Sequence, residues 1–417
     1  MVHPKMKWTY VGGDSHKDTH TMVFIDCFFG KIGEITFRNI PSEFDAFLKE
    51  AQKFKVIGTS FAFGLEDVSA YGRALNVFLT EKKQLVKHVN ATLVASERKS
   101  RNTLQKTDSF DAECAARVLL SRFDELPVCD PQDKYWILGS LVARRNSIVK
   151  LNVALINHLH SLITDNYPDY RKYFPNIATK TALIFFEKYP SPVKLFGVSA
   201  EELTEPFKNT RNNRFTIARA EEFLAYIEKC GFKASEYQAE KDFTIMSTVR
   251  QLTANLYEIA EMDKQLESFL PKFDYKLTSM KGIDTVMASK LIAEIGDIKR
   301  FPNPAKLAKY AGVSPVTYAS GKSDCQYANE RGNRELNQIF FSLAMNLTKP
   351  TGINRKIINH YFYSYYLKKI SEGKTKKQAI KCVERRLVNI IYGMMKNNTE
   401  YINPPTYDEP KEETQTA

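Results

Sequence analysis

The sequence has few cysteines and no long hydrophobic run. Six cysteines among 417 residues include no CxxC pair and are too sparse for a disulfide scaffold, so we expect free thiols in a reducing cytoplasm. No apolar run approaches the roughly 18 residues that a membrane span needs. Residues 1–7 show no apolar segment of a signal peptide. We therefore expect a cytoplasmic protein without a membrane partner.

The overall composition excludes several other classes of protein. Hydrophobic residues make up 43% and charged residues 26% of the chain, which is ordinary for a protein that folds around large cores. A wholly disordered, collagen-like or mucin-like chain is excluded. Sixty Lys and Arg against 48 Asp and Glu give a net charge of +12, which favours a polyanionic partner, most commonly nucleic acid. The length predicts two or three domains.

Positive charge is concentrated near the end of the chain. Residues 346–398 contain twelve Lys and Arg against two acids, so this stretch supplies +10 of the net +12. A solvated helix face would interleave more acids. We therefore expect phosphate contacts from a cluster across two predicted helices: Lys374, Lys376, Lys377, Lys381, Arg385 and Arg386. Further candidates are Lys322, Arg331 and Arg334. Residues 403–417 reverse the sign and predict a disordered acidic tail.

Residues 1–130 alternate between strand and helix patterns. Three adjacent strands followed by alternating helices and strands are the order of a ribonuclease-H-like (RuvC-like) mixed sheet. A doubly wound sheet would need a crossover helix after its first strand, and none is indicated. The patterns predict strands at 7–13, 21–27, 34–38, 55–65 and 84–89, and helices at 42–53 (capped by Ser42), 70–79 and 108–122.

The rest of the chain is predicted to be helical. Within residues 131–277, apolar residues recur at helical spacing over 136–165 and 242–269, which predicts an antiparallel coiled-coil pair. The proline-punctuated helical insert at 167–239 is either a dimerisation or a nucleic-acid-grasping element. Residues 278–402 predict a small helical domain whose first glycine-led turn is either a helix-hairpin-helix or a plain helical hairpin. The predicted fold class is therefore α/β plus all-α.

Four acidic residues stand where a ribonuclease-H-like sheet could bring them together. Asp14 and Glu66 end the first and fourth predicted strands, which lie side by side in such a sheet. Asp108 and Asp111 share one face of a predicted helix. Converging carboxylates repel one another unless cations lie between them, and hard oxygen ligands select Mg²⁺ or Mn²⁺. Two such ions can activate an attacking oxygen and stabilise a leaving oxygen on a phosphodiester.

Each acid also has a structural explanation that needs no metal. Asp108 could cap its helix, and Asp111 could complement the helix dipole. Asp14 could start a turn, and Glu66 could be a solvated loop acid. Histidines are weaker candidates for ligands, because the glycines before Asp14 favour a strand end and turn at His16 rather than a continuous strand. We therefore expect no zinc site.

Several blocks of residues carry a resemblance to a known family. The ordered set resembles the DEDD-type insertion-sequence transposases, the "IS one-ten" class, also called bridge-RNA-guided recombinases, from about Lys7 to Lys396. The N-terminal blocks that carry it are residues 13–20, 64–66 and 106–112. The C-terminal blocks are residues 282–283, 293–297, 301–302, 311–315, 320–321 and 331–334.

The resemblance implies a RuvC-like nuclease domain, a coiled-coil connection and a small helical transposase domain with a serine nucleophile. The matching serine is Ser320. Many relatives carry two serines before the glycine, but Ala319 replaces the first here, and Lys322 replaces a second glycine. Ser323 lies close by as another candidate nucleophile. On the residues alone, a turn serine beside a flexible glycine is the simpler explanation of Ser320.

The leading hypothesis is a DNA transposase or recombinase that cuts and rejoins donor and target DNA through Ser320, with Mg²⁺ or Mn²⁺ at the four acids. The resemblance further implies a structured non-coding guide RNA, a homo-oligomer (dimer or tetramer) and a place in the prokaryotic cytoplasm or nucleoid. One alternative is a RuvC-like metal-dependent junction endonuclease that uses water, with Ser320 structural. Another alternative is a non-catalytic nucleic-acid-binding protein whose acids are caps and loop charges.

Overall fold

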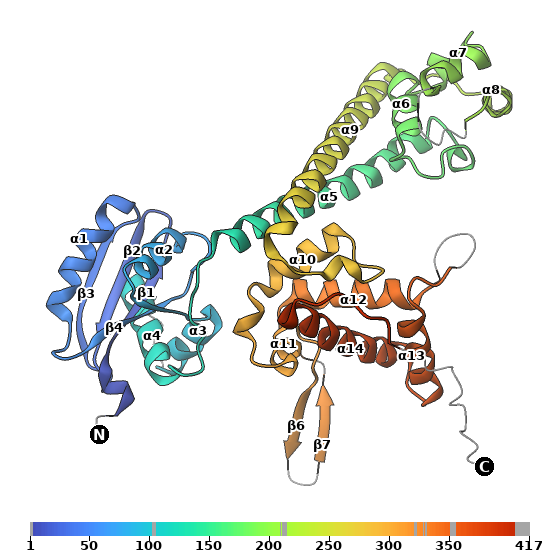
Figure 1. Cartoon of the computed structure of the whole chain (residues 1–417). Helices are drawn as coiled ribbons and strands as arrows, with labels where there is room; N and C mark the ends of the chain where they lie inside the picture. Colours follow the sequence, from blue (N-terminus) through green and yellow to red (C-terminus); the bar gives the residue numbers. More distant parts are fainter. Residues whose placement is uncertain are drawn as a thin grey trace, which may run out of the picture. The chain divides into compact units, whose positions relative to one another are not determined.

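The computed structural model describes residues 3–101, 106–208, 210, 215–320, 323–327, 329, 332–350 and 356–404, with backbone alone at 317–320 and 323–326. The chain forms two compact units, Met1–Trp136 and Ile137–Ala417 (Figure 1). The predicted acidic tail lies almost entirely outside the described residues. Within the described residues, no helix has the length and hydrophobicity that crossing a membrane requires.

The first unit is built on a five-stranded mixed sheet, which confirms the predicted α/β sheet. The strand order is β3-β2-β1-β4-β5 (Figure 1). The first three strands pair antiparallel, whereas β4 pairs parallel with both β1 and β5. The strands are β1 Trp8–Ser15, β2 Thr19–Ile25, β3 Lys31–Arg38, β4 Ser60–Leu65 and β5 Leu85–His88.

Helices cover both faces of this sheet. Tyr10 on β1 packs in one core with Val94 and a row of alanines and leucines from α4. Val11, the next residue, faces a second core with Phe44 of α1 and Leu75 of α2. Strands buried on both faces have nearly continuous apolar sequences, as β1, β2 and β4 do. The helices are α1 Pro41–Ala51, α2 Arg73–Glu81, α3 Ala91–Ser100 and α4 Asp108–Ser121, with 3₁₀ turns at Pro4–Lys7 and Gln52–Phe54.

Three local predictions in this unit were wrong. Ser42 does not cap α1, because Pro41 occupies its first turn and Ile40 is the N-cap residue without a side-chain bond. The strand predicted at 55–65 begins only at Ser60. Helix α3 was not predicted, although the Asn90 side chain caps it by accepting the Thr92 N–H at 2.8 Å. The apolar periodicity of α3 is weak because one residue, Val94, is buried.

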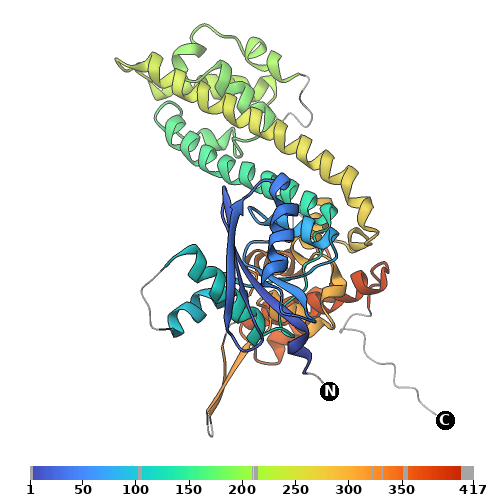
Figure 2. The ribbon, with the colours of Figure 1, turned by 90° about the vertical axis from the view of Figure 1, so that its left-hand side faces the viewer.

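Two 32-residue helices dominate the first part of the second unit: α5 Asp133–Thr164, whose first four residues belong to the first unit, and α9 Gln238–Phe269. They lie side by side in both views (Figures 1 and 2). Arg145 Nε on α5 donates to Asp263 on α9 at 2.5 Å. Asn255 on α9 donates to Asn152 on α5 at 2.8 Å. Residue 145 of α5 pairs with residue 263 of α9, whereas the later residue 152 pairs with the earlier residue 255. The two helices therefore run antiparallel, as predicted.

The insert between these helices has its own aromatic core. Tyr167, Phe185 and Phe223 are fully buried and pack against Val249 and Leu252 of α9. The insert is helical, as predicted. Its helices are α6 Lys180–Lys188, α7 Ala200–Thr204 and α8 Ile217–Cys230, with 3₁₀ turns at Tyr170–Lys172, Pro192–Leu195 and Glu205–Phe207.

The last part of the second unit is a helical layer with one β-hairpin, which was not predicted. The cations of residues 376–386 share one helix, α14, rather than two. The elements are α10 Thr285–Ile295, α11 Pro304–Tyr310, β6 Val316–Ser320, β7 Ser323–Tyr327, α12 Arg334–Thr348, α13 His360–Ser371 and α14 Lys376–Asn397. Further 3₁₀ turns are Leu270–Phe273, Leu277–Ser279 and Ile298–Arg300.

Candidate functional site

Asp14 and Glu66 lie at the same edge of the sheet. Strands β1 and β4 are parallel neighbours, and Gly13 lies opposite Leu65 in their register. Asp14 follows Gly13, Glu66 follows Leu65, and both acids are half-buried. The carboxyl ends of adjacent parallel strands meet at one edge, which is where ligand sites form in open α/β sheets.

Helix α4 brings two more acids to this edge. Its N-cap is Thr107, whose hydroxyl accepts the Phe110 N–H at 3.2 Å, so the alternative that Asp108 caps this helix is wrong. Asp108 is the first helical residue, and its side chain is 56% exposed. The helix lies directly against β1, because a Cβ on Gly12 would come within 2.1 Å of the Ala112 carbonyl oxygen.

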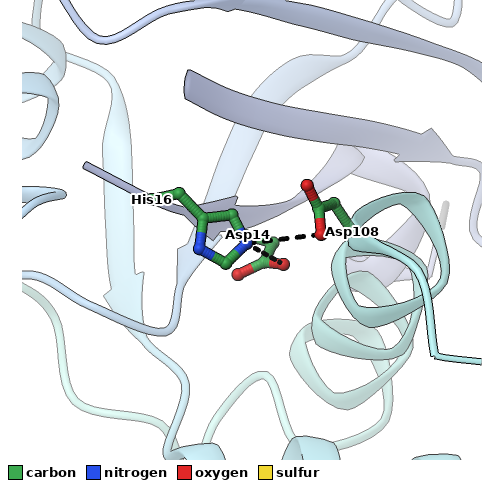
Figure 3. Close-up of side chains that lie close together, drawn as sticks. All are labelled: Asp14, His16 and Asp108. Atoms are coloured by element: carbon green, nitrogen blue, oxygen red, sulfur yellow. Dashed lines mark hydrogen bonds and ion pairs between the residues drawn. The ribbon is translucent and has the colours of Figure 1, made fainter. Parts of the chain in front are cut away.

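The His16 ring contacts two of the acids (Figure 3). Its Nε2 is 3.2 Å from Asp14 Oδ2 and 3.4 Å from Asp108 Oδ1. The ligand atoms of these three residues all lie within 4.8 Å of one another. His16 was not predicted to be a ligand. The predicted turn is present, since the His16 N–H donates to the Thr19 carbonyl, but this turn directs the ring toward Asp14.

The charges of neighbouring acids raise the pKa values of Asp14 and Glu66. Burial raises the pKa of Asp14, and the charges of Asp108 and Asp111 raise it further, against a lowering by His16. Burial also raises the pKa of Glu66, with added contributions from Asp14 and Asp111. Among the described residues, the group whose ligand atoms lie within 4.8 Å of one another contains Asp14, His16 and Asp108 but neither Glu66 nor Asp111. The four carboxylates therefore form one interacting group with a tighter centre at Asp14 and Asp108.

The donor set of this group fits a divalent cation. Two half-buried carboxyl groups have pKa values raised by burial and by neighbouring acids, so a cation between them would relieve the repulsion. Carboxylate oxygens suit Mg²⁺ and Mn²⁺, and an imidazole suits transition metals. A position for His16 in the ligand shell is therefore chemically consistent with the predicted acids.

Asp67 supports the site and was missed by the sequence analysis. Its carboxylate accepts the backbone N–H groups of Ser69, Ala70 and Tyr71 at 2.9, 2.8 and 2.7 Å. Burial alone would raise the pKa of Asp67, but these backbone bonds lower it overall. The bonds hold the chain immediately after Glu66. The available sequence signal for such a turn is an Asp followed two residues later by a serine and five residues later by a glycine.

Ser320 and Ser323 lie at the same end of the β6–β7 hairpin. They are paired in the strand register and flank the two-residue link. Ser320 is the last residue of strand β6, and the two residues that follow it lie outside the described part of the chain, so the explanation of Ser320 as a turn serine stays a prediction. Both views show the hairpin projecting from the helices of its own unit (Figures 1 and 2).

The root of the hairpin is tightly held. A Cβ on Gly332 would lie 2.4 Å from the Gly312 Cα, so the two backbones touch. The Asn333 N–H donates to the Tyr310 carbonyl at 2.7 Å, and the Asn333 side chain donates to Glu294 at 2.8 Å. The chain is therefore fixed where it leaves α11 and where it enters α12.

The predicted phosphate-binding cations differ in their surroundings. Lys374, Lys376 and Lys377 are exposed, as is Arg334 at the start of α12. Arg385 is half-buried. The two remaining cations of α14 have intramolecular partners: Lys381 donates to Glu384 at 2.7 Å, and Arg386 Nε donates to the Tyr361 hydroxyl at 2.7 Å. Lys322 and Arg331 lie outside the described residues.

Two family models match the chain. The "Transposase IS116/IS110/IS902 family" model matches residues 274–357, and a DEDD transposase model of the IS110 class matches residues 11–168. Together they match more than half of the chain. The four acids lie within the second match, and Ser320 lies within the first.

Individual relatives agree with these matches. An insertion element IS116 protein of Streptomyces clavuligerus is 27% identical over 72% of this chain and 73% of its own length. An insertion element IS110 protein of Streptomyces coelicolor is 25% identical over 71% of this chain and 72% of its own. A pilin gene-inverting protein of Moraxella lacunata is 26% identical over 37% of this chain and 47% of its own.

Proposed function

The chain belongs to the IS110 class of DEDD transposases, and from this premise we propose that it cuts and rejoins donor and target DNA through a serine nucleophile. The proposed nucleophile is Ser320, and the proposed metal ligands are Asp14, Glu66, Asp108 and Asp111. A DNA-inverting relative, the pilin gene-inverting protein, supports strand exchange rather than simple cleavage.

The observation that carries the proposal is the grouping of acids at the shared end of β1 and β4. Asp14 and Asp108, together with His16, would hold a divalent cation, Mg²⁺ or Mn²⁺, and Glu66 and Asp111 would complete its surroundings. A bound cation would supply positive charge to the attacking and leaving oxygens of a phosphodiester. The sheet and α4 hold these side chains in place from two sides.

The proposed covalent step uses Ser320. Its Oγ attacks a DNA phosphorus, an O–P bond forms and the P–O bond to the leaving strand breaks. The serine proton passes to solvent, and the leaving oxygen takes up a proton. A hydroxyl from a second DNA end then attacks the phosphoserine, so the broken strand is joined to a new partner and the serine is regenerated. Each step exchanges one phosphate ester bond for another, so the strands can be rejoined without a further source of energy.

The proposal includes partners. Following the family resemblance, a homo-oligomer, dimer or tetramer, would combine the acids of one subunit with the serine of another. A structured non-coding RNA would pair with donor and target DNA. The exposed cations of α14 and of the turn before it are proposed to contact nucleic-acid phosphates.

The test is a covalent protein–DNA adduct that survives denaturation. Ser320→Ala is expected to lose the adduct, whereas Ser323→Ala, the matched control at the paired position, should keep it. Asp14→Asn should lose the adduct in Mg²⁺ and regain part of it in excess Mn²⁺, which should not rescue Ser320→Ala.

Three outcomes would contradict the proposal in different ways. Wild-type amounts of adduct in Ser320→Ala would move the nucleophile to Ser323 or elsewhere. Metal-dependent cleavage without an adduct in any variant would favour the water-using junction endonuclease. Nucleic-acid binding with neither cleavage nor adduct would favour a non-catalytic binding protein.

A further inference from the structure

One acid of the site already has a cationic partner within the protein. Arg98, on α3, places a guanidinium nitrogen 2.5 Å from Asp111 Oδ1. The Asp111 side chain is 12% exposed and that of Arg98 is 26% exposed, so this pair is shielded more than an ordinary surface ion pair. Asp111 therefore has one of its oxygens directed at an arginine.

Arg98 also acts on a second acid of the site. Its charge lowers the pKa of Glu66, against the raising by burial, Asp14 and Asp111. The guanidinium therefore lies close to two of the four carboxylates. Arg101, three residues further along the chain, is directed elsewhere and contacts Glu113 at 2.7 Å. The two arginines provide a matched pair with different anionic partners.

We propose that Arg98 is a built-in counter-ion of the acidic site, which pairs with Asp111 in the absence of metal and competes with a divalent cation for that carboxylate. This rests on the proposed function in one respect, because it takes Asp111 as part of the metal site. Arg98 acts through Asp111 and is a positioning residue rather than a catalytic one.

The competition follows from charge and geometry. An arginine cannot lose its proton in a protein, so its positive charge is always present. A divalent cation bound beside Asp111 would be repelled by the guanidinium and would share its ligand, so binding must displace or weaken the ion pair. Without Arg98, the shielded carboxylate has no compensating charge until the metal binds.

Linkage makes the effect measurable in both directions. Since the arginine and the metal oppose one another, removing Arg98 must strengthen metal binding by the same factor by which metal binding weakens the ion pair. A ligand that binds more tightly also stabilises the fold more. Both tryptophans, Trp8 and Trp136, lie in the unit that contains the site, so tryptophan fluorescence reports the unfolding of that unit in the full chain.

The experiment compares Arg98→Gln with Arg98→Lys and with the control Arg101→Gln in the full-length protein. Mn²⁺ affinity is measured by electron paramagnetic resonance of the free ion, and thermal unfolding is followed in EDTA and in Mg²⁺. We expect Arg98→Gln to bind Mn²⁺ about fivefold more tightly and to gain more from Mg²⁺ in Tm than the wild type. Arg98→Lys, which retains charge but not the planar fork, should gain about twofold. Arg101→Gln should bind like the wild type.

The outcomes separate this inference from the proposed function. Unchanged or weaker Mn²⁺ binding in folded Arg98→Gln would overturn the inference. If Arg98→Gln folds in neither buffer, equal affinities of Arg98→Lys and the wild type would overturn it. If Asp14→Asn binds Mn²⁺ as well as the wild type does, or if the wild type binds none, the proposed metal site is wrong, and the counter-ion inference is wrong with it.

Discussion

Asp14 lies on a central strand whose two faces are covered by separate cores, whereas Ser320 lies on a hairpin that forms a two-stranded sheet of its own. The acidic edge of the sheet is therefore positioned by the packing of an entire unit. The serine hairpin is positioned at its root, where Gly332 touches Gly312 and Asn333 bonds to Tyr310.

The difference follows from what each chemistry requires. Metal ligands must be held within a fraction of an ångström, which rigid elements with supporting contacts provide. An isolated two-stranded hairpin is marginally stable in water and gains its order from where it is anchored. Changes in the first unit should therefore act through its folding, and changes at the hairpin root should act on the reaction without unfolding the first unit.

The largest expected effect is that of Gly12→Ala. The added Cβ would meet the Ala112 carbonyl oxygen at 2.1 Å and the Ala116 nitrogen at 2.2 Å, and these backbone atoms cannot move aside cheaply. We expect a loss of about 3 kcal/mol or more in the free energy of unfolding, measured by tryptophan fluorescence in urea. Gly139→Ala, in α5 with no atom within 4 Å of the new Cβ, should leave it unchanged or slightly raised. If Gly12→Ala and the wild type unfold at the same urea concentration, the close contact between β1 and α4 does not determine the stability of this unit.

Gly332→Ala should lower the reaction without destabilising the first unit. Its Cβ would lie 2.4 Å from the Gly312 Cα and nitrogen, so the root must open. We expect covalent adduct to fall about a hundredfold, as misplacement of a reacting group by about 1 Å can cost, while the tryptophan-monitored transition stays at the wild-type position. Gly393→Ala, in α14 with open space around the new Cβ, is the control. Full adduct formation by Gly332→Ala would refute positioning of the hairpin from its root.

The free energy of unfolding should depend on pH through the acids at the edge of the sheet. Folding raises the pKa of Asp14 above its ordinary value of 3.8 and that of Glu66 above 4.5. The folded state then binds more protons than the unfolded state, so stability is highest below the ordinary values and falls as the pH rises through the raised ones. Other acids of the unit, such as Asp67, have lowered pKa values and contribute the opposite trend, so the test is the difference between two proteins. In EDTA, urea unfolding should show that the stability of the wild type relative to Asp14→Asn falls as the pH rises over this interval, and a relative stability that rises would contradict the burial of the Asp14 charge.

The smallest expected effect concerns DNA binding by α14. Lys376 and Lys377 are exposed, so the double change to Gln should flatten the slope of log K against log salt by about 1.8, or 0.9 for each phosphate contact. The matched double change of Lys381 and Arg386, which have intramolecular partners, should alter the slope much less. Fluorescence anisotropy at several salt concentrations measures both. Equal slopes for all three proteins would remove this face from the nucleic-acid interface.

Much of the first unit could be predicted because its signals are local. Continuous apolar runs mark β1, β2 and β4, and the row of alanines and leucines marks α4. The placement of Asp14 and Glu66 at strand ends followed from these runs. His16 was misjudged because a turn can aim a ring in either direction, and the sequence does not indicate which.

Helix α3 and the β6–β7 hairpin could not be predicted for a different reason. Few side chains of α3 are buried, so its apolar period is faint, and the partner of Arg98 is contributed by another helix. Each hairpin strand has only five residues, and polar and apolar residues alternate over just three or four of them, which is too short a pattern to predict a strand.

By itself, the sequence determined the order of elements, the concentration of positive charge and the acids at strand and helix ends, since these depend on neighbours along the chain. Tertiary structure alone decided that His16 contacts both Asp14 and Asp108, that Arg98 pairs with Asp111 and that two glycines anchor the hairpin. Such contacts join residues from separate elements, and their distances depend on how closely helices and strands pack, which no local pattern specifies.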